Sequence, residues 1–495
     1  MSAQAVEYDD IQGLVRFGYK RLTQACFLLL RVTDPAAARA WLAQAPVSSA
    51  KTQEPPPATA LQVAFTSGGL QALGLRPDVV EAFSHEFIVG MASDASRARR
   101  LGDLGPNDPA AWQWGGTPEQ LPHVLLMLYA LPGGLEDWQR TVLAQCELGF
   151  ELMACLDTCD MDGTEPFGFA DGISEPSIDW QRQRAVRDEE RDGYSNVACL
   201  GEFLLGYPNE YGAYTDRPLL DTDRDPAAVL PRAEDAPDKV DLGRNGSYLV
   251  LRQLQQDVAG FWRFIDVQVD GDPALRKRLA ETLVGRTMEG EALVGDTGER
   301  IPGEDDPRNS FTYASDAEGL RCPIGAHIRR SNPRNADLPP GRPGLVSWAR
   351  RTLGFDAQAL AADKVSPARF HRLLRRGREY GTGVSIEQAL SFATGEATGL
   401  HFICLGANIA RQFEFVQSAW LAGLRFDGLA DESDPLTATH LPRDDGTPTD
   451  GFSIPLESGP DRRVGGLPQF VTVRGGAYFF LPGLRALRYL SKVQP

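Results

Sequence analysis

The sequence predicts an α+β protein made of two similar halves, each with an antiparallel sheet and peripheral helices. Apolar runs of strand length alternate with stretches that begin like capped helices, and this alternation occurs twice. An Asp-, Pro- and Arg-rich stretch at 218–244 interrupts it, and the chain of 495 residues exceeds a usual single domain. We therefore expect ferredoxin-like halves at 1–217 and 245–495, with a linker or excursion between them.

The first half alternates three strand patterns with three helix patterns. Asp34 followed by Pro35 is typical of an N-cap and a first helical position, and Thr66 offers a hydroxyl cap. A segment rich in Pro and Thr after residue 50 is expected to be a loop. The expected strands are 25–32, 60–65 and 124–129, and the expected helices start near 34 and 66 and span about 134–146.

The second half repeats this pattern and adds an insertion. We expect the insertion at about 338–370, where Pro-Pro-Gly precedes an Ala-rich helical piece. Late strands are expected between 462 and 482, with Val471 and Val473 facing inward together because they lie two residues apart. The other expected elements are strands at 246–254 and 399–405 and helices within 257–264 and 408–421. The two halves look like a diverged duplication of one unit.

The composition is that of an ordinary globular protein with an acidic surface. Hydrophobic residues make up 42% of the chain, charged residues 24%, and the net charge of −17 argues against nucleic acid as a partner. No run of 18 apolar residues predicts a membrane span. The N-terminus resembles neither a signal peptide nor a twin-arginine signal, so we expect a cytoplasmic protein. Seven scattered cysteines favour free thiols over a disulfide framework or a zinc site.

One acidic side chain is expected in a glycine-rich bend between aromatic residues. Residues 167–176 read Phe-Gly-Phe-Ala-Asp-Gly-Ile-Ser-Glu-Pro, with Asp171 between two glycines. Glycine permits positive φ and close backbone approach, so this run aims an acid from a tight bend. The two phenylalanines suit an acid that works in a dry pocket. The alternative is an Asp-Gly turn on the surface.

One of the six histidines is followed by a cluster of arginines. His327 lies in the run Cys-Pro-Ile-Gly-Ala-His-Ile-Arg-Arg-Ser-Asn-Pro-Arg at 322–334. A neutral imidazole is the usual axial ligand of a peroxidase haem iron, and guanidinium groups pair with carboxylates such as the haem propionates. The alternative is a basic surface loop with an incidental histidine.

Five strings in order along the chain resemble those of the dye-decolorizing peroxidases. Two are the Asp171 run and the His-Ile-Arg-x-x-x-Pro-Arg string, and a third is Arg-Arg-Gly with Tyr-Gly at 375–381. The remaining two are Gly-Leu-His-Phe at 399–402 and Gln-Phe-Glu at 412–414. The resemblance covers nearly the whole chain, and its long interval before the third string is similar to that of the longer, elaborated members. Where the family usually has an apolar residue and a proline, this chain has Arg378 and Glu379.

The resemblance implies one haem b per chain, bound mainly by the C-terminal half. His327 would be the proximal iron ligand, and Arg334, with Arg329 as a second candidate, would hold a propionate. Leu400 and Phe402, two apart on a strand, would wall the distal pocket, and His401 between them would point away as a structural histidine.

The resemblance also implies which residues take part in catalysis. Asp171 would be the distal acid and Arg375 the distal guanidinium, with Arg376 as a rival; a solvated basic helix end is the alternative for both arginines. Glu414 would accept the second ring proton of the proximal histidine, unless it forms a helix-surface salt bridge. Trp420 is a candidate exit for electrons from bulky donors, although such tryptophans usually lie in the core.

The function implied is that of a haem peroxidase. Hydrogen peroxide would be reduced, and dyes, phenols and similar donors would be oxidised in one-electron steps through a ferryl intermediate. No nucleic acid or membrane partner is expected, and a homo-oligomer is left open. Two alternatives remain: a haem carrier or iron-releasing protein on the same fold, and a non-catalytic assembly or cargo protein.

Overall fold

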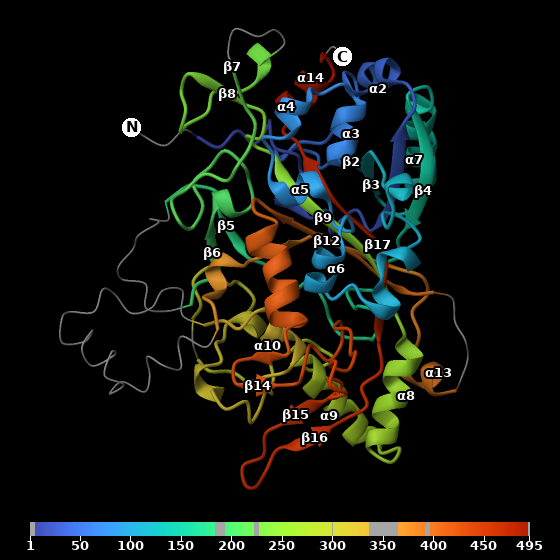
Figure 1. Cartoon of the computed structure of the whole chain (residues 1–495), viewed down its shortest axis with the longest axis vertical. Coiled ribbons are helices and arrows are strands. Elements are labelled where there is room, and N and C mark those ends of the chain that lie inside the picture. Colours follow the sequence, from blue (N-terminus) through green and yellow to red (C-terminus); the bar gives the residue numbers. More distant parts are fainter. Residues whose placement is uncertain are drawn as a thin grey trace, which may run out of the picture.

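One nine-stranded antiparallel sheet runs through the molecule (Figure 1). The computed structural model describes residues 5–183, 194–221, 227–298, 300–335, 365–391 and 397–493. The strand order is β10-β12-β9-β17-β2-β3-β1-β4, and β11 also pairs with β12. The strands are β1 Gln24–Val32, β2 Thr59–Phe65, β3 Val124–Ala130, β4 Phe150–Asp157, β9 Ser247–Gln256, β10 Leu374–Arg375, β11 Arg378–Tyr380, β12 Gly399–Gly406 and β17 Val471–Leu481.

Both halves of this sheet have the same strand order. The N-terminal half reads β4-β1-β3-β2, and the C-terminal half reads β17-β9-β12 followed by β10 and β11. In each half the first and third strands are central and the second and fourth lie at the edges, which is the ferredoxin-like arrangement. The predicted α+β fold of two ferredoxin-like halves is therefore confirmed. The exact division of the chain at 217 and 244 stays a prediction.

Helices begin where the sequence offers caps. The Asp34 side chain accepts hydrogen bonds from the backbone N–H groups of Ala36 and Ala37, and the Thr66 hydroxyl accepts one from Gly69. Residues 410–421 form turns of π-helical type. The main helices are α2 Pro35–Leu42, α3 Ser67–Ala72, α5 His85–Val89, α6 Ala95–Leu101, α7 Leu135–Cys146, α8 Val258–Gln268, α9 Pro273–Val284, α10 His327–Ser331, α13 Ile386–Leu390 and α14 Leu484–Leu490.

The sheet is buried on both faces, and each core extends across both halves. Alternate residues of β1 illustrate this: Cys26 and Leu28 belong to one core, whereas Phe27 and Leu29 belong to the other. In Figure 1 the N-terminal strands lie above β9, β12 and β17, and α8, α9 and α10 lie at the opposite end. The two halves therefore share a continuous interior.

The segments between and beyond the two halves are less regular. Residues 218–244, expected to be a linker or excursion, contain the antiparallel strands β7 Leu219–Asp221 and β8 Lys239–Asp241. The expected insertion at 338–370 lies outside the described residues except for 365–370. Within the described parts of the chain, no helix has both the length and the apolar character needed to cross a membrane.

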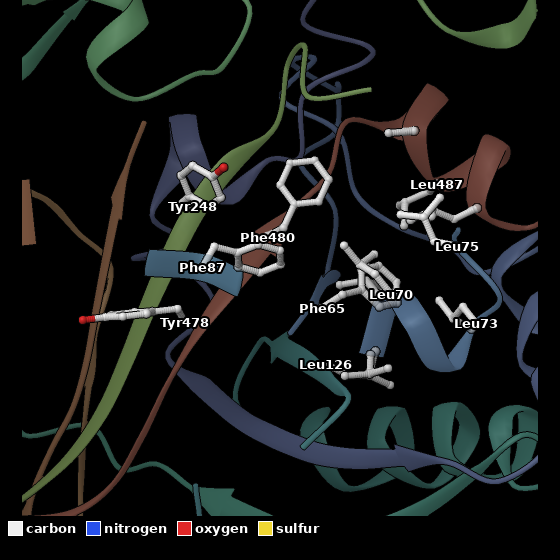
Figure 2. Packing of buried hydrophobic residues seen from close by; sticks show 14 of the residues in the cluster. Phe65, Leu70, Leu73, Leu75, Phe87, Leu126, Tyr248, Tyr478, Phe480 and Leu487 are labelled. Carbon is white, nitrogen blue, oxygen red and sulfur yellow. The ribbon is translucent and has the colours of Figure 1, made fainter. Parts of the chain in front are cut away.

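The two half-sheets meet at β17 and β2 through the pair Phe480 and Phe65. Phe480 is fully buried, and its ring centroid lies 4.9 Å from that of Phe83. Figure 2 shows Phe480 close to Phe87 of α5 and Tyr248 of β9. Aromatic packing thus supports a junction that has little backbone pairing of its own.

Removing the Phe480 ring should destabilise the protein strongly. Phe480→Ala would leave a cavity at the junction, and we expect the free energy of unfolding to fall by about 3–5 kcal/mol. Denaturant unfolding followed by circular dichroism measures this. Phe17→Ala is the matched control because that ring is 39% exposed. An equal loss in both variants would contradict the importance of the junction.

Candidate active site

A cavity of about 330 Å³ lies on one face of the C-terminal half of the sheet. Its floor consists of alternate residues from neighbouring strands, because side chains two apart share a face. Leu400 and Phe402 of β12 line it, and so do Val471 and Val473 of β17, which face inward as predicted. Most of the lining comes from the C-terminal half, and the Asp171 loop comes from the N-terminal half.

His401 points to the opposite face of β12, as predicted. It is buried, its Nε2 lies 3.0 Å from the carbonyl oxygen of Asp157, and its ring stacks on Tyr380 at 4.5 Å. Burial lowers the pKa of His401 to about 4, so the ring is neutral. It is a structural histidine outside the cavity, and its buried Nδ1 has no hydrogen-bond partner among the described residues.

The Asp171 loop is a tight, hydrogen-bonded bend. Gly168 and Gly172 have φ angles of +97° and +71°, as the sequence required. The Glu165 carboxylate accepts the backbone N–H groups of Phe167 and Phe169, both at 3.1 Å. Burial raises the pKa of Glu165 to about 7. These bonds hold the loop so that Asp171 faces the cavity.

Arg375 reaches Asp171 from β10. Its Nη1 donates to Asp171 Oδ1 at 3.3 Å, and both side chains line the cavity. Burial raises the pKa of Asp171, but Arg375 and the backbone N–H of Gly172 outweigh it and the net pKa is lowered. Arg376, the rival, donates instead to the carbonyls of Leu14 and Val15. The structure therefore brings Arg375, and not Arg376, to the acid.

His327, the first residue of α10, also lines the cavity. Its Nδ1 lies 2.9 Å from Asp434 Oδ2, and the Asp434 side chain has no exposed surface. Because a carboxylate only accepts, Nδ1 carries a proton, and in the neutral ring Nε2 keeps a free lone pair. Burial lowers the pKa of His327, but Asp434 outweighs it and raises the pKa overall. Hydrogen bonding and His327 hold the pKa of Asp434 at about 2 despite its burial.

The assignment of Glu414 as the partner of His327 is wrong. Glu414 pairs with Arg97 of α6 and accepts the Tyr478 hydroxyl at 2.9 Å. It lies on π-type turns whose faces differ from those of a regular helix, and it is turned toward β17. Asp434 takes its place, fixed by the backbone N–H groups of Leu436 and Thr437 at 3.1 and 2.8 Å.

The side chains of Arg329 and Arg334, the two candidates for binding a propionate, point in different directions. Arg329, two residues further along α10, turns away and donates to the carbonyls of Asp316 and Cys322 at 2.9 and 2.8 Å. It does not contribute to the described lining of the cavity, so its assignment to a propionate is wrong. Arg334 does line the cavity and donates to Ser174 Oγ at 3.3 Å.

A further arginine, Arg286, was not singled out as a site residue from the sequence. Both Arg286 and Arg334 line the cavity, are 6% and 4% exposed, and donate to Asn309. Among the described residues neither forms an ion pair with a carboxylate. Burial and the neighbouring Arg334 lower the pKa of Arg286 to about 10. The lining therefore carries buried positive charge that favours an anion.

Aromatic side chains close another part of the cavity. Trp420 and His371 both line it, and their ring centroids lie 5.2 Å apart. Trp420 is only 4% exposed, so it is not itself a surface site for electron exit. Burial lowers the pKa of His371 to about 4. Its Nε2 lies 2.7 Å from the Ser366 hydroxyl.

In comparisons with known proteins, the relatives found are peroxidases by name. No family model matches the chain. The dye-decolorizing peroxidase msp1 of Mycetinis scorodonius is 27% identical over 99% of this chain and 89% of its own. The multifunctional dye peroxidase DyP2 of an Amycolatopsis strain is 29% identical over 77% of this chain and 74% of its own. The chain is thus similar to dye-decolorizing peroxidases over most of its length.

A solved structure supports the same fold. It is a dye-decolorizing peroxidase in complex with 2,6-dimethoxyphenol, 22% identical, with a TM-score of 0.69. The match covers 98% of this chain and 100% of that chain. The likeness of fold extends over both ferredoxin-like halves.

A solved dye-decolorizing peroxidase has a haem pocket, and the lining of this cavity fits haem. The side chain of His327, whose Nε2 is free, lines the cavity, and so do the apolar side chains of Leu400 and Phe402. Arg286 and Arg334 offer buried guanidinium groups of the kind that bind propionates. A flat apolar group with carboxylates at one edge meets each of these requirements.

Haem retention should depend on Asp434 and not on Glu414. Asp434→Asn removes the charge that orients His327, and we expect haem affinity to fall by about 10–100-fold. Titration of haem into the haem-free protein, followed by absorption, measures this. Glu414→Gln is the control, because Glu414 contacts Arg97 and Tyr478 instead. A larger loss in Glu414→Gln would reverse the assignment.

Proposed function

We propose that the chain is a haem peroxidase that uses hydrogen peroxide to oxidise dyes, phenols and similar aromatic donors. The observation that carries this proposal is that Asp171 and Arg375 contact each other in the lining of the cavity that His327 also lines. A haem carrier needs no acid and guanidinium of this kind. The relatives named dye peroxidases and the neighbour in complex with 2,6-dimethoxyphenol support the class of donor.

The cofactor we propose is one haem b per chain. His327 would hold it through Nε2, Arg334 and Arg286 would bind its propionates, and Leu400 and Phe402 would contact the ring. Bound haem supplies the redox-active iron that peroxide oxidises and that donors reduce in single-electron steps. The cytoplasm is the compartment we propose, since all seven cysteines have free thiols.

Asp171 is suited to move a proton between the two oxygens of peroxide. Its lowered pKa keeps the carboxylate ionised at neutral pH, so it can accept a proton from one oxygen and return it to the leaving oxygen. Arg375 carries a fixed positive charge 3.3 Å from that carboxylate. It can stabilise the negative charge that develops as the O–O bond breaks.

Two variants separate these roles by their pH dependence. Asp171→Asn should slow the peroxide-induced change in haem absorption by about 10²–10⁴-fold and abolish the acid limb of its pH profile. Arg375→Leu should slow it by about 10²–10³-fold. The acid limb should remain and move to higher pH, because the charge that lowers the pKa of Asp171 is gone. Stopped-flow absorption over a pH series measures both.

In the parent protein the rate should fall only below about pH 3.9, the ordinary pKa of aspartate, because Arg375 lowers this pKa. Both variants should retain haem, since neither residue contacts the iron. If Asp171→Asn reacts at the parent rate while Arg375→Leu does not, the arginine alone carries the step.

Bulky donors require a route from the surface to the cavity. Tyr211 is 56% exposed and stacks on Phe370 at 4.3 Å. The next residue, His371, stacks on Phe415 at 3.7 Å, and Phe415 lies 5.4 Å from Trp420. Trp420 and His371 line the cavity. We infer that Tyr211 is the outer end of an aromatic path and that Trp420 is its inner end.

Tyr211→Phe keeps the stacking and removes the phenol. We expect oxidation of a large anthraquinone dye to slow several-fold, whereas oxidation of the much smaller donor 2,6-dimethoxyphenol should change far less. Steady-state rates with each donor measure this. Tyr214→Phe is the matched control, because its hydroxyl bonds Glu234 instead. If Tyr211→Phe changed the rate by the same factor with both donors, relative to the parent protein, the path would be excluded.

A further inference from the structure

Glu175 holds the side chain and the backbone of Arg375 at once. Its Oε1 lies 3.0 Å from Arg375 Nε, and its Oε2 accepts the Arg375 backbone N–H at 2.9 Å. The carbonyl of Ser174, one residue earlier, accepts Arg375 Nη2 at 3.0 Å. Two consecutive residues of the Asp171 loop therefore fix the guanidinium whose Nη1 reaches Asp171.

Glu175 lies behind Arg375, outside the described lining of the cavity. Its own carbonyl accepts the Asn196 side chain at 2.6 Å, so the loop is anchored on that side too. Arg376 Nη1 lies 3.7 Å from Oε2. One carboxylate thus fixes the side chain and backbone of Arg375, a geometry that leaves the guanidinium few alternatives.

We propose that Glu175 is a positioning residue that holds Arg375 in place beside Asp171 and shares its positive charge. The proposal rests on the proposed function, since it assigns Arg375 to peroxide cleavage. With Glu175 ionised, Arg375 lies between two carboxylates. Glu175, which takes no part in proton transfer, fixes the orientation of the guanidinium. Without that charge, the guanidinium should turn toward Asp171 alone and leave the position where negative charge develops.

Several other charged or titratable groups surround Asp171 and Glu175 and must be separated from this effect. Glu379 is the best residue for a control variant, because it pairs with Leu400 across neighbouring strands and therefore lies on the cavity face of the sheet. Its charge acts on Asp171, yet among the described residues it has no ion pair with Arg375. The remaining groups are Glu165 of the same loop, Lys20, Arg286, His327, Arg334, Arg376 and Cys404.

The test compares Glu175→Gln with Glu379→Gln in the haem-loaded protein. Both remove a negative charge near Asp171, so in both the acid limb of the peroxide reaction should move to lower pH. Only Glu175→Gln should also lower the plateau rate, by about 10–10²-fold, because Arg375 is displaced. Glu175→Asp keeps the negative charge, but its side chain is too short to hold Arg375. It should therefore lower the plateau rate and hardly move the acid limb of the pH profile.

A crystal structure of Glu175→Gln provides a readout that does not depend on activity. We expect the Arg375 guanidinium to have left its place and to face Asp171 with two donors. An unmoved Arg375, or a plateau rate equal to that of Glu379→Gln, would overturn the proposal. A parent protein that binds haem but does not react with peroxide would instead refute the proposed function, while the position of Arg375 would still decide the role of Glu175.

Discussion

The hydrogen bond between His327 and Asp434 is the interaction on which the site depends. It places a proton on Nδ1 of His327. In the neutral ring, Nε2 of this cavity-lining side chain is therefore left unprotonated. The surrounding structure supports it from both ends. Asp434 is fixed by backbone N–H groups, and Arg330, three residues after His327, donates to the carbonyls of Trp420 and Glu432 at 2.6 and 2.8 Å. The helix that carries the histidine is thus tied to the segment that carries its acid.

Buried charge organises the rest of the cavity. On one side, Arg375 is balanced by Asp171 and Glu175, so its charge is paired and its direction is fixed. On another, Arg286 and Arg334 are buried against backbone carbonyls and Asn309, and neither has a carboxylate partner within the described parts of the chain. Unpaired buried charge is costly, and an anionic ligand relieves that cost. One cavity is therefore lined by a histidine, by an acid with its guanidinium, and by two buried guanidinium groups that can bind carboxylates.

Much of this could be predicted from local sequence. The period of two along β12 sends Leu400 and Phe402 into the cavity and His401 away from it. Two glycines with positive φ made the Asp171 bend recognisable. Asp434 could not be identified, because it is 107 residues from His327 and nothing local distinguishes it from Asp431 or Glu432. Glu414 was misassigned because π-type turns change which side of a helical segment a residue faces. Burial of Arg286 likewise depends on the tertiary fold.

The central claim is that haem binds in this cavity on His327, with Asp171 and Arg375 at its opposite face. A crystal structure of the haem-loaded protein tests it most directly. The account predicts iron coordinated by His327 Nε2, propionates at Arg286 and Arg334, and Asp171 across the ring from the histidine. His371 also lines the cavity and is the competing histidine. Iron coordinated by His371, or haem bound elsewhere, would contradict the account.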